Sequence, residues 1–189
     1  MRILRTKDQV VLMASAAEAR WVGHILRTLI DRYRIPPDEL DVKTAGVWYS
    51  TRGCTAATMS AEETREWIQH LQEFKGARLQ VLERCEAHLR TVPPDRVARL
   101  SLSLAEASEL IIALNDHRLA QAAQHNIGET EMTCELKNWH RLRPEQHQAL
   151  AEIHLLAQMI EQLVRSVAPE AADWPNATDW RPGQSPEEG

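Results

Sequence analysis

Residues 102–124 read LSLAEASELIIALNDHRLAQAAQ, and this stretch predicts the helix around which the rest of the chain packs. Ser103 and Glu106 have the S-x-x-E spacing of a capping box, in which the two side chains satisfy backbone N–H groups at a helix start. Apolar residues then occupy nearly every side of the helix. A surface helix has one apolar stripe, so this pattern favours a buried central helix.

Four polar residues, Asn115-Asp116-His117-Arg118, interrupt this helix near its middle. No residue of opposite charge lies four positions from Asp116 or Arg118. If these side chains are buried, their partners must come from other elements or from a ligand, because an unpaired buried charge is costly. One interpretation is a structural network that ties the central helix to its neighbours. The other is a binding surface or pocket formed by Asn115, Asp116 and Arg118.

Two more capping boxes predict two more long helices. One helix begins at Ser15 and should end near Arg34, and the other begins at Ser60 and should end near Thr91. A Pro-Pro pair follows each predicted end, and proline cannot continue a helix.

The remaining patterns complete a mainly α domain over residues 1–168. Residues 2–6 and 9–13 alternate around a short turn and predict an N-terminal β-hairpin. Residues 130–142 and 144–167 keep apolar residues at helical spacing and predict two further helices. We therefore expect about five helices arranged around the central buried helix, with the short β-hairpin at the start.

The segment at residues 169–189 is an acidic tail rich in proline, and we expect it to be at least partly disordered. It contains Trp174 and Trp180, which are unusual in such a composition. Each indole could anchor the tail in a groove of its own chain or of a neighbouring one.

Residues 35–59 have no sustained periodicity, so we expect a long connection with a short strand inside residues 42–54. Long loops in compact domains are often functional, which makes Trp48, Tyr49 and Arg52 candidate binding residues. The alternative is that the tryptophan and the tyrosine cover the core.

The overall charge limits the class of partner. The chain of 189 residues has a formal net charge of −5, with a mildly basic start and an acidic end. Broad DNA binding requires a concentrated basic face, so the composition argues against nucleic acid as a partner. No apolar run approaches the roughly 20 residues that span a bilayer, and no signal peptide is evident. The three widely spaced cysteines are typical of reduced thiols, so we expect a cytoplasmic protein without membrane contact.

Sequence motifs of catalysis and metal binding are missing from the chain. It has no C-x-x-C or H-E-x-x-H metal motif, no Walker phosphate loop, no G-x-G-x-x-G and no G-x-S-x-G. The sequence therefore predicts no catalytic residue, no metal ligand and no cofactor.

The motif L-N-D-x-R-L at residues 114–119, preceded by an acidic helix start and an apolar stretch, resembles a family of uncharacterised bacterial proteins. Members of that family are best known from actinobacteria and are often encoded beside the adaptor of the Clp protease. The likeness lies mainly in residues 102–119. It implies a cytoplasmic protein connected with regulated proteolysis and carries no known activity.

Together these patterns favour a non-enzymatic regulatory or adaptor-like protein that binds another protein, or itself as a homodimer. A first alternative is a DNA-binding transcriptional regulator that uses Arg20, Arg27 and Arg34 of the first helix. A second is a small-ligand-binding protein or enzyme with a pocket near Asp116 and Arg118.

Overall fold

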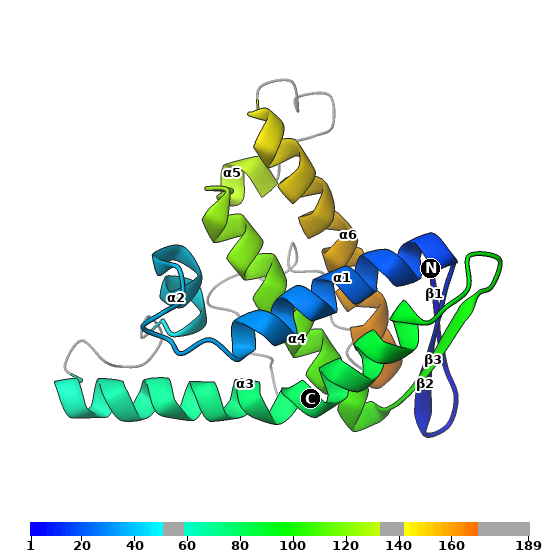
Figure 1. Cartoon of the computed structure of the whole chain (residues 1–189), viewed down its shortest axis with the longest axis horizontal. Helices are drawn as coiled ribbons and strands as arrows, with labels where there is room; N and C mark the ends of the chain where they lie inside the picture. The colour runs from blue at the N-terminus through cyan, green and yellow to red at the C-terminus, as the bar shows by residue number, and fades with distance from the viewer. Residues whose placement is uncertain (51–58, 133–141, 170–189) are drawn as a thin grey trace, which may run out of the picture.

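The structure is a computed structural model that describes residues 1–50, 59–132 and 142–169. It confirms a mainly α fold with a small antiparallel sheet at the N-terminal end (Figure 1). The elements in chain order are β1 (Arg2–Arg5), β2 (Gln9–Ala14), α1 (Ala16–Tyr33), α2 (Val42–Trp48), α3 (Ala61–Arg90), β3 (Ala98–Ser103), α4 (Leu104–Gln124), α5 (Glu129–Met132) and α6 (Pro144–Val167).

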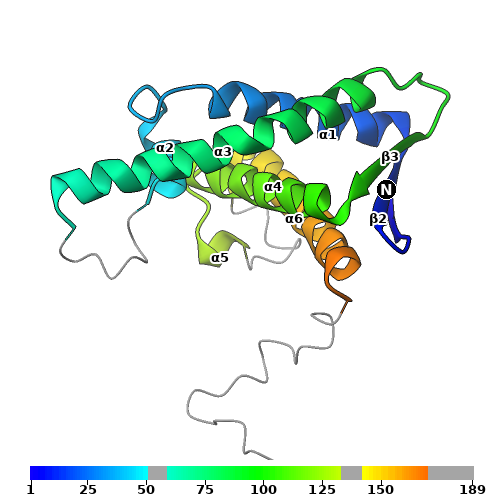
Figure 2. The same cartoon turned by 90° about the horizontal axis from the view of Figure 1, so that it is seen from below.

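Helix α4 is the centre of the domain, as predicted. The most extensive helix contacts join α1 to α3 and α4 to α6, and α4 also contacts α1, α2, α3 and the sheet (Figures 1 and 2). Leu110 and Leu114 on α4 are almost completely buried. We expected α4 to be buried on nearly every side, and this was wrong along one edge. There Ile112 and Leu119 are 41% and 37% exposed.

The sheet has a third strand that the sequence analysis did not assign. The predicted hairpin forms β1 and β2, and β3 pairs antiparallel with β2 on its other side. Along β3, Ala98, Leu100 and Leu102 point inward and alternate with exposed residues. This alternation is the ordinary signature of a half-buried strand. It was missed because β3 is short and runs directly into the cap of α4 at Ser103.

Residues 42–48 form a helix, α2, and the short strand expected between residues 42 and 54 was wrong for this part. Asp41 caps α2, because its carboxylate accepts a hydrogen bond from the backbone N–H of Thr44 at 2.9 Å. Aspartate is a favoured N-cap, and this local interaction outweighs the β-propensity of the valine and threonine that follow. Residues 51–58 lie outside the described part.

Helices α5 and α6 follow the central helix. Helix α5 begins at Glu129, one residue before the predicted start at residue 130, and residues 133–141 of the predicted helix lie outside the described residues. Helix α6 matches its prediction and buries Leu150, Ile153, Leu156 and Leu163. The tail from residue 170 onward also lies outside the described part. No helix in the described ranges is long and apolar enough to span a bilayer.

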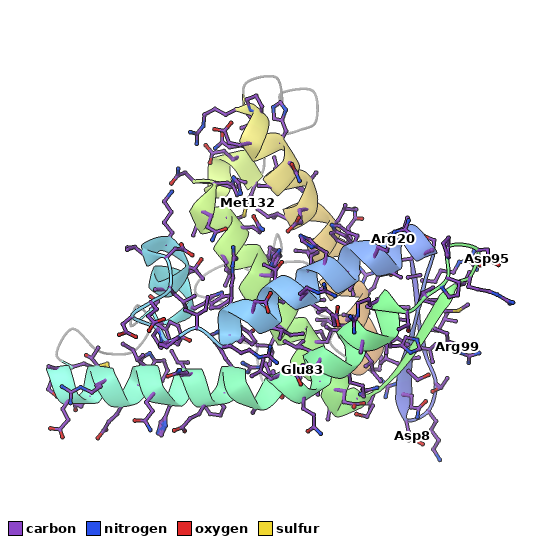
Figure 3. All side chains as sticks on the ribbon, in the orientation of Figure 1. Asp8, Arg20, Glu83, Asp95, Arg99 and Met132 are labelled. Atoms are coloured by element: carbon purple, nitrogen blue, oxygen red, sulfur yellow. The ribbon has the colours of Figure 1, made fainter. Side chains whose placement is uncertain are left out.

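Helix α3 is divided into two halves by its packing. Leu82, Cys85 and Leu89 in the second half are fully buried. None of residues 61–74, all of which are described, is buried. Figures 1 and 3 show this first half extending past the other described helices, with side chains along its lower edge pointing away from the body. Residues 61–74 are called the α3 arm below.

Candidate functional site

Asp116, the acidic residue in the polar interruption of α4, joins three other helices. Its Oδ2 accepts hydrogen bonds from the Tyr33 hydroxyl of α1 and the Lys75 ammonium of α3, each at 2.6 Å. Its backbone oxygen accepts a hydrogen bond from the indole Nε1 of Trp48 in α2, at 2.8 Å. Asp116 therefore has partners from other elements, as predicted, and these partners are protein side chains.

Lys75 is the buried cation of this cluster and is only 5% exposed. Its Nζ lies 4.8 Å from the ring centroid of Trp48, 5.3 Å from that of Tyr33 and 5.8 Å from that of Tyr49. Aromatic faces carry partial negative charge and attract a cation within about 6 Å. The three rings and the carboxylate of Asp116 thus replace much of the hydration that burial removes from the ammonium group.

The protonation of the cluster follows from its burial. Burial raises the pKa of Tyr33 far above its usual value, and the adjacent charge of Asp116 raises it further, so the hydroxyl remains a hydrogen-bond donor. Burial also raises the pKa of Tyr49. Burial lowers the pKa of Lys75, while the charge of Asp116 opposes that shift. The arrangement is a desolvated ion pair whose partners satisfy each other, which suits a structural lock better than a reactive site.

The other predicted site residues divide into two groups. Trp48 and Tyr49 are buried in the main core, and their rings meet the cluster. Asn115 and Arg118 are half-buried and form no hydrogen bond or ion pair with any part of the chain that the structure describes. Arg52 lies outside the described residues. The predicted binding role of all these residues remains a prediction.

Sequence analysis missed Lys75 as a member of the site. A signal was present, because a lysine four residues after Leu71 stands on the apolar stripe of α3 that continues to Leu82. A charged residue on such a stripe predicts a buried partner of opposite charge. The sequence could have supplied this expectation but not the identity of the partner.

A second polar contact joins α4 to α6. The ring of His117 is 2% exposed, and its Nε2 lies 2.6 Å from Oε1 of Glu152 and 3.3 Å from the amide of Gln121. Its other ring nitrogen, Nδ1, has no partner among the residues that are described. The histidine thus contributes to helix packing, and the remainder of the polar interruption does not converge on it.

An open groove lies between the α3 arm and the segment that leads into α2. It has a volume of about 760 Å³ and is lined by Pro37, Asp38, Ala45, Tyr49, Arg65, Ile68, Gln69, Gln72 and Glu73. Tyr49 belongs both to this groove and to the rings around Lys75. The ion pair therefore positions one wall of the groove.

The described ranges contain no group of three or more side chains arranged to hold a metal ion. Comparisons of the chain with family models, with curated proteins and with solved structures find no match.

Proposed function

We propose that this protein is a non-enzymatic, cytoplasmic regulatory protein of the adaptor type. In this proposal it binds another protein through the α3 arm and the groove beside it. The observation that carries the proposal is the division of α3. A stripe of apolar residues that is buried in the second half continues along the first half, where it is only partly covered.

The partly covered half of the stripe has the spacing of a binding helix. Trp67, Leu71 and Phe74 follow one another at intervals of four and three residues, as the buried Leu82, Cys85 and Leu89 do at intervals of three and four. Trp67 and Leu71 are half-buried, and Phe74 is 62% exposed. Large apolar side chains at helical spacing anchor helix-in-groove complexes, and aromatic anchors contribute most of the binding energy.

The charge of the α3 arm indicates the kind of partner. Its residues include four glutamates, at positions 62, 63, 66 and 73, against one arginine at position 65. A complementary partner is an amphipathic helix with basic residues beside its apolar face, because matched charges speed association and exclude wrong partners. Two α3 arms would repel each other, so we propose a different protein rather than a second copy of this one.

The two alternatives have less support. For DNA binding, Arg27 pairs with Glu86, and Arg34 pairs with Glu83 at 2.6 Å, so both arginines already face carboxylates of α3. For a pocket near Asp116, the carboxylate is already bound by Lys75 and Tyr33. The link to regulated proteolysis implied by the resemblance stays part of this proposal and suggests where to look for the partner.

The proposal is tested by partner capture with a matched pair of variants. Phe74→Glu places a charge on the α3 arm, and Val97→Glu does the same at a residue of equal exposure, 62%, beside the sheet. Both variants are first checked for an unchanged circular-dichroism spectrum and melting temperature. Tagged proteins then capture partners from native lysate, with and without nuclease, and each partner identified by mass spectrometry is purified for affinity measurement.

The expected result is one protein partner that binds wild type and Val97→Glu equally but binds Phe74→Glu at least about tenfold more weakly, since loss of an aromatic anchor typically costs more than 1 kcal/mol. Equal binding by the two variants would refute the role of the α3 arm. If partners are captured only when nuclease is absent, the DNA-binding alternative would be favoured.

A further inference from the structure

A second groove lies between α1 and α6, near the sheet. It has a volume of about 390 Å³. Met1, Ala17, Glu18 and Trp21 line one side, and Leu155, Gln158, Met159 and Gln162 of α6 line the other. Leu155 is 52% exposed, so a large apolar side chain faces solvent at this site. Methionine thioethers and an indole form a favourable surface for another aromatic ring.

We propose that this groove is the docking site for the chain's own C-terminal tail, with Trp174 as the anchor. The tail would then be a strap that covers Trp21 and Leu155 and joins α6 to α1. This inference is independent of the partner proposed for the α3 arm.

The place where the tail leaves the domain supports this occupant. Arg5 of β1 donates hydrogen bonds to the backbone oxygens of Ser166 and Val167, at 3.0 and 3.1 Å. These contacts place the end of α6 at the edge of the sheet. A cation at this position also satisfies the free carbonyl groups of a helix C-terminus. The tail therefore starts on the end of the molecule that carries the groove.

The reach of the tail matches the position of the groove. At the rise of an α-helix, Leu155 lies about 18 Å and Gln162 about 8 Å along α6 from Val167. Trp174 can extend up to about 25 Å from Val167, so it can reach the whole length of the groove. Pro169 follows the last turn and favours a change of direction there.

Charge favours the same docking. The tail after Pro169 has five acidic residues and one arginine. The exposed Arg2 and Arg20 are chain neighbours of the lining residues Met1 and Trp21, and the exposed Arg5 contacts the end of α6. Since a short tether of a few residues would hold the tail at an effective concentration on the order of millimolar, even a weak contact within one chain is favoured over one with a second copy.

The test uses the full chain labelled with 5-fluorotryptophan and studied by ¹⁹F NMR. Each of the six tryptophans gives a resonance, and the shift between H₂O and D₂O reports how exposed each indole is. Single tryptophan substitutions assign the resonances. Leu155→Glu removes the apolar wall of the groove, and Val97→Glu is the control at an exposed apolar residue outside it.

In wild type and in Val97→Glu we expect the indole of Trp174 to be protected from solvent. In Leu155→Glu we expect it to be fully exposed to solvent. If Leu155→Glu does not fold, Trp174→Ala supplies the same information, because loss of the anchor should move the Trp21 resonance. The proposal would be overturned if Trp174 is exposed to solvent in wild type, or if it is still protected from solvent in Leu155→Glu. Solvent protection of Trp180 in place of Trp174 would overturn the choice of Trp174 as the anchor. Protection of Trp174 that is lost when the protein is diluted would overturn docking within one chain and assign the groove to the tail of a second copy.

Discussion

Replacing Asp116 by asparagine tests the role of the buried ion pair most directly. The substitution keeps the size of the side chain and removes the charge that faces Lys75. The side chains of Lys75 and Asp116 are only 6% and 14% exposed, so the ammonium group would be left in the core without its counter-ion. Breaking a buried pair on one side typically lowers the free energy of unfolding by about 3–5 kcal/mol.

Two features of the site place the expected loss near the low end of that range. The rings of Trp48, Tyr33 and Tyr49 still face the ammonium group, and cation–π contacts at desolvated sites contribute about 2 kcal/mol. The lysine can also lose its proton, which limits the penalty to about 1.4 kcal/mol for each unit by which the pH lies below its ordinary pKa of 10.5. We therefore expect Asp116→Asn to cost about 3 kcal/mol.

A double-mutant cycle separates the ion pair from its surroundings. Lys75→Met should cost less than Asp116→Asn, because Asp116 keeps the hydrogen bond from Tyr33 and some contact with solvent. The double variant has no buried charge left, so it should be more stable than Asp116→Asn alone. The expected coupling free energy is about 2 kcal/mol, measured by urea denaturation.

The control for this cycle is Glu161→Ala, which breaks an exposed pair with Arg165 on α6. Side chains in that pair are 60% and 65% exposed, so the loss should stay below about 1 kcal/mol. Additive losses in the cycle, or a loss below about 1 kcal/mol for Asp116→Asn, would refute the view that this ion pair locks the four helices together.

The pH dependence of the Asp116→Asn variant gives a second readout with a defined sign. Burial lowers the pKa of Lys75 from 10.5, and removal of Asp116 removes the charge that opposes this shift. The unfolded lysine then binds a proton that the folded one releases, so the stability of the variant should rise with pH in the alkaline range below about pH 10. Above pH 10.0, Tyr33 should make the stability fall with pH. Its raised pKa keeps the folded hydroxyl protonated, while the unfolded tyrosine releases its proton. A stability that falls over the lower window would contradict this assignment.

Three further predictions concern the core, the helix caps and the acid limb of the stability profile. Leu114→Ala, at a side chain with no exposure, should lower the free energy of unfolding by about 2–5 kcal/mol in urea, and a loss below about 1 kcal/mol would mean that α4 is not the core helix. Ser103→Ala should lower global stability by about 1 kcal/mol, whereas Ser60→Ala should mainly speed amide hydrogen exchange in the α3 arm; equal global losses would show that the arm is part of the cooperative core. Glu18 has its pKa lowered to about 2 by its bond to the N-terminal amine, so its stabilising effect is present above pH 4.5 and is lost as the pH falls toward 2. Glu18→Gln should flatten that acid limb in chemical denaturation, and an unchanged limb would exclude this role.

Much of the secondary structure could be predicted because it depends on interactions between near neighbours. The capping boxes at Ser15, Ser60 and Ser103 all form as expected, and each joins residues only three positions apart. Apolar spacing also predicted the helix over residues 144–167, which forms as α6. Two local patterns were missed. The Asp41 cap was overlooked before α2, and the alternation in β3 was overlooked before α4.

The sequence by itself therefore determined where most helices begin and end and which helix lies at the centre. It also determined that Asp116 would need partners from elsewhere in the chain. Only the tertiary structure decided who those partners are, since Lys75 and Tyr33 lie 41 and 83 positions away in the chain. It likewise decided that the apolar stripe of α3 is covered at Leu82 and left open at Phe74. The physical reason is that capping and periodicity act within a few residues, whereas pairing and burial depend on how whole helices pack.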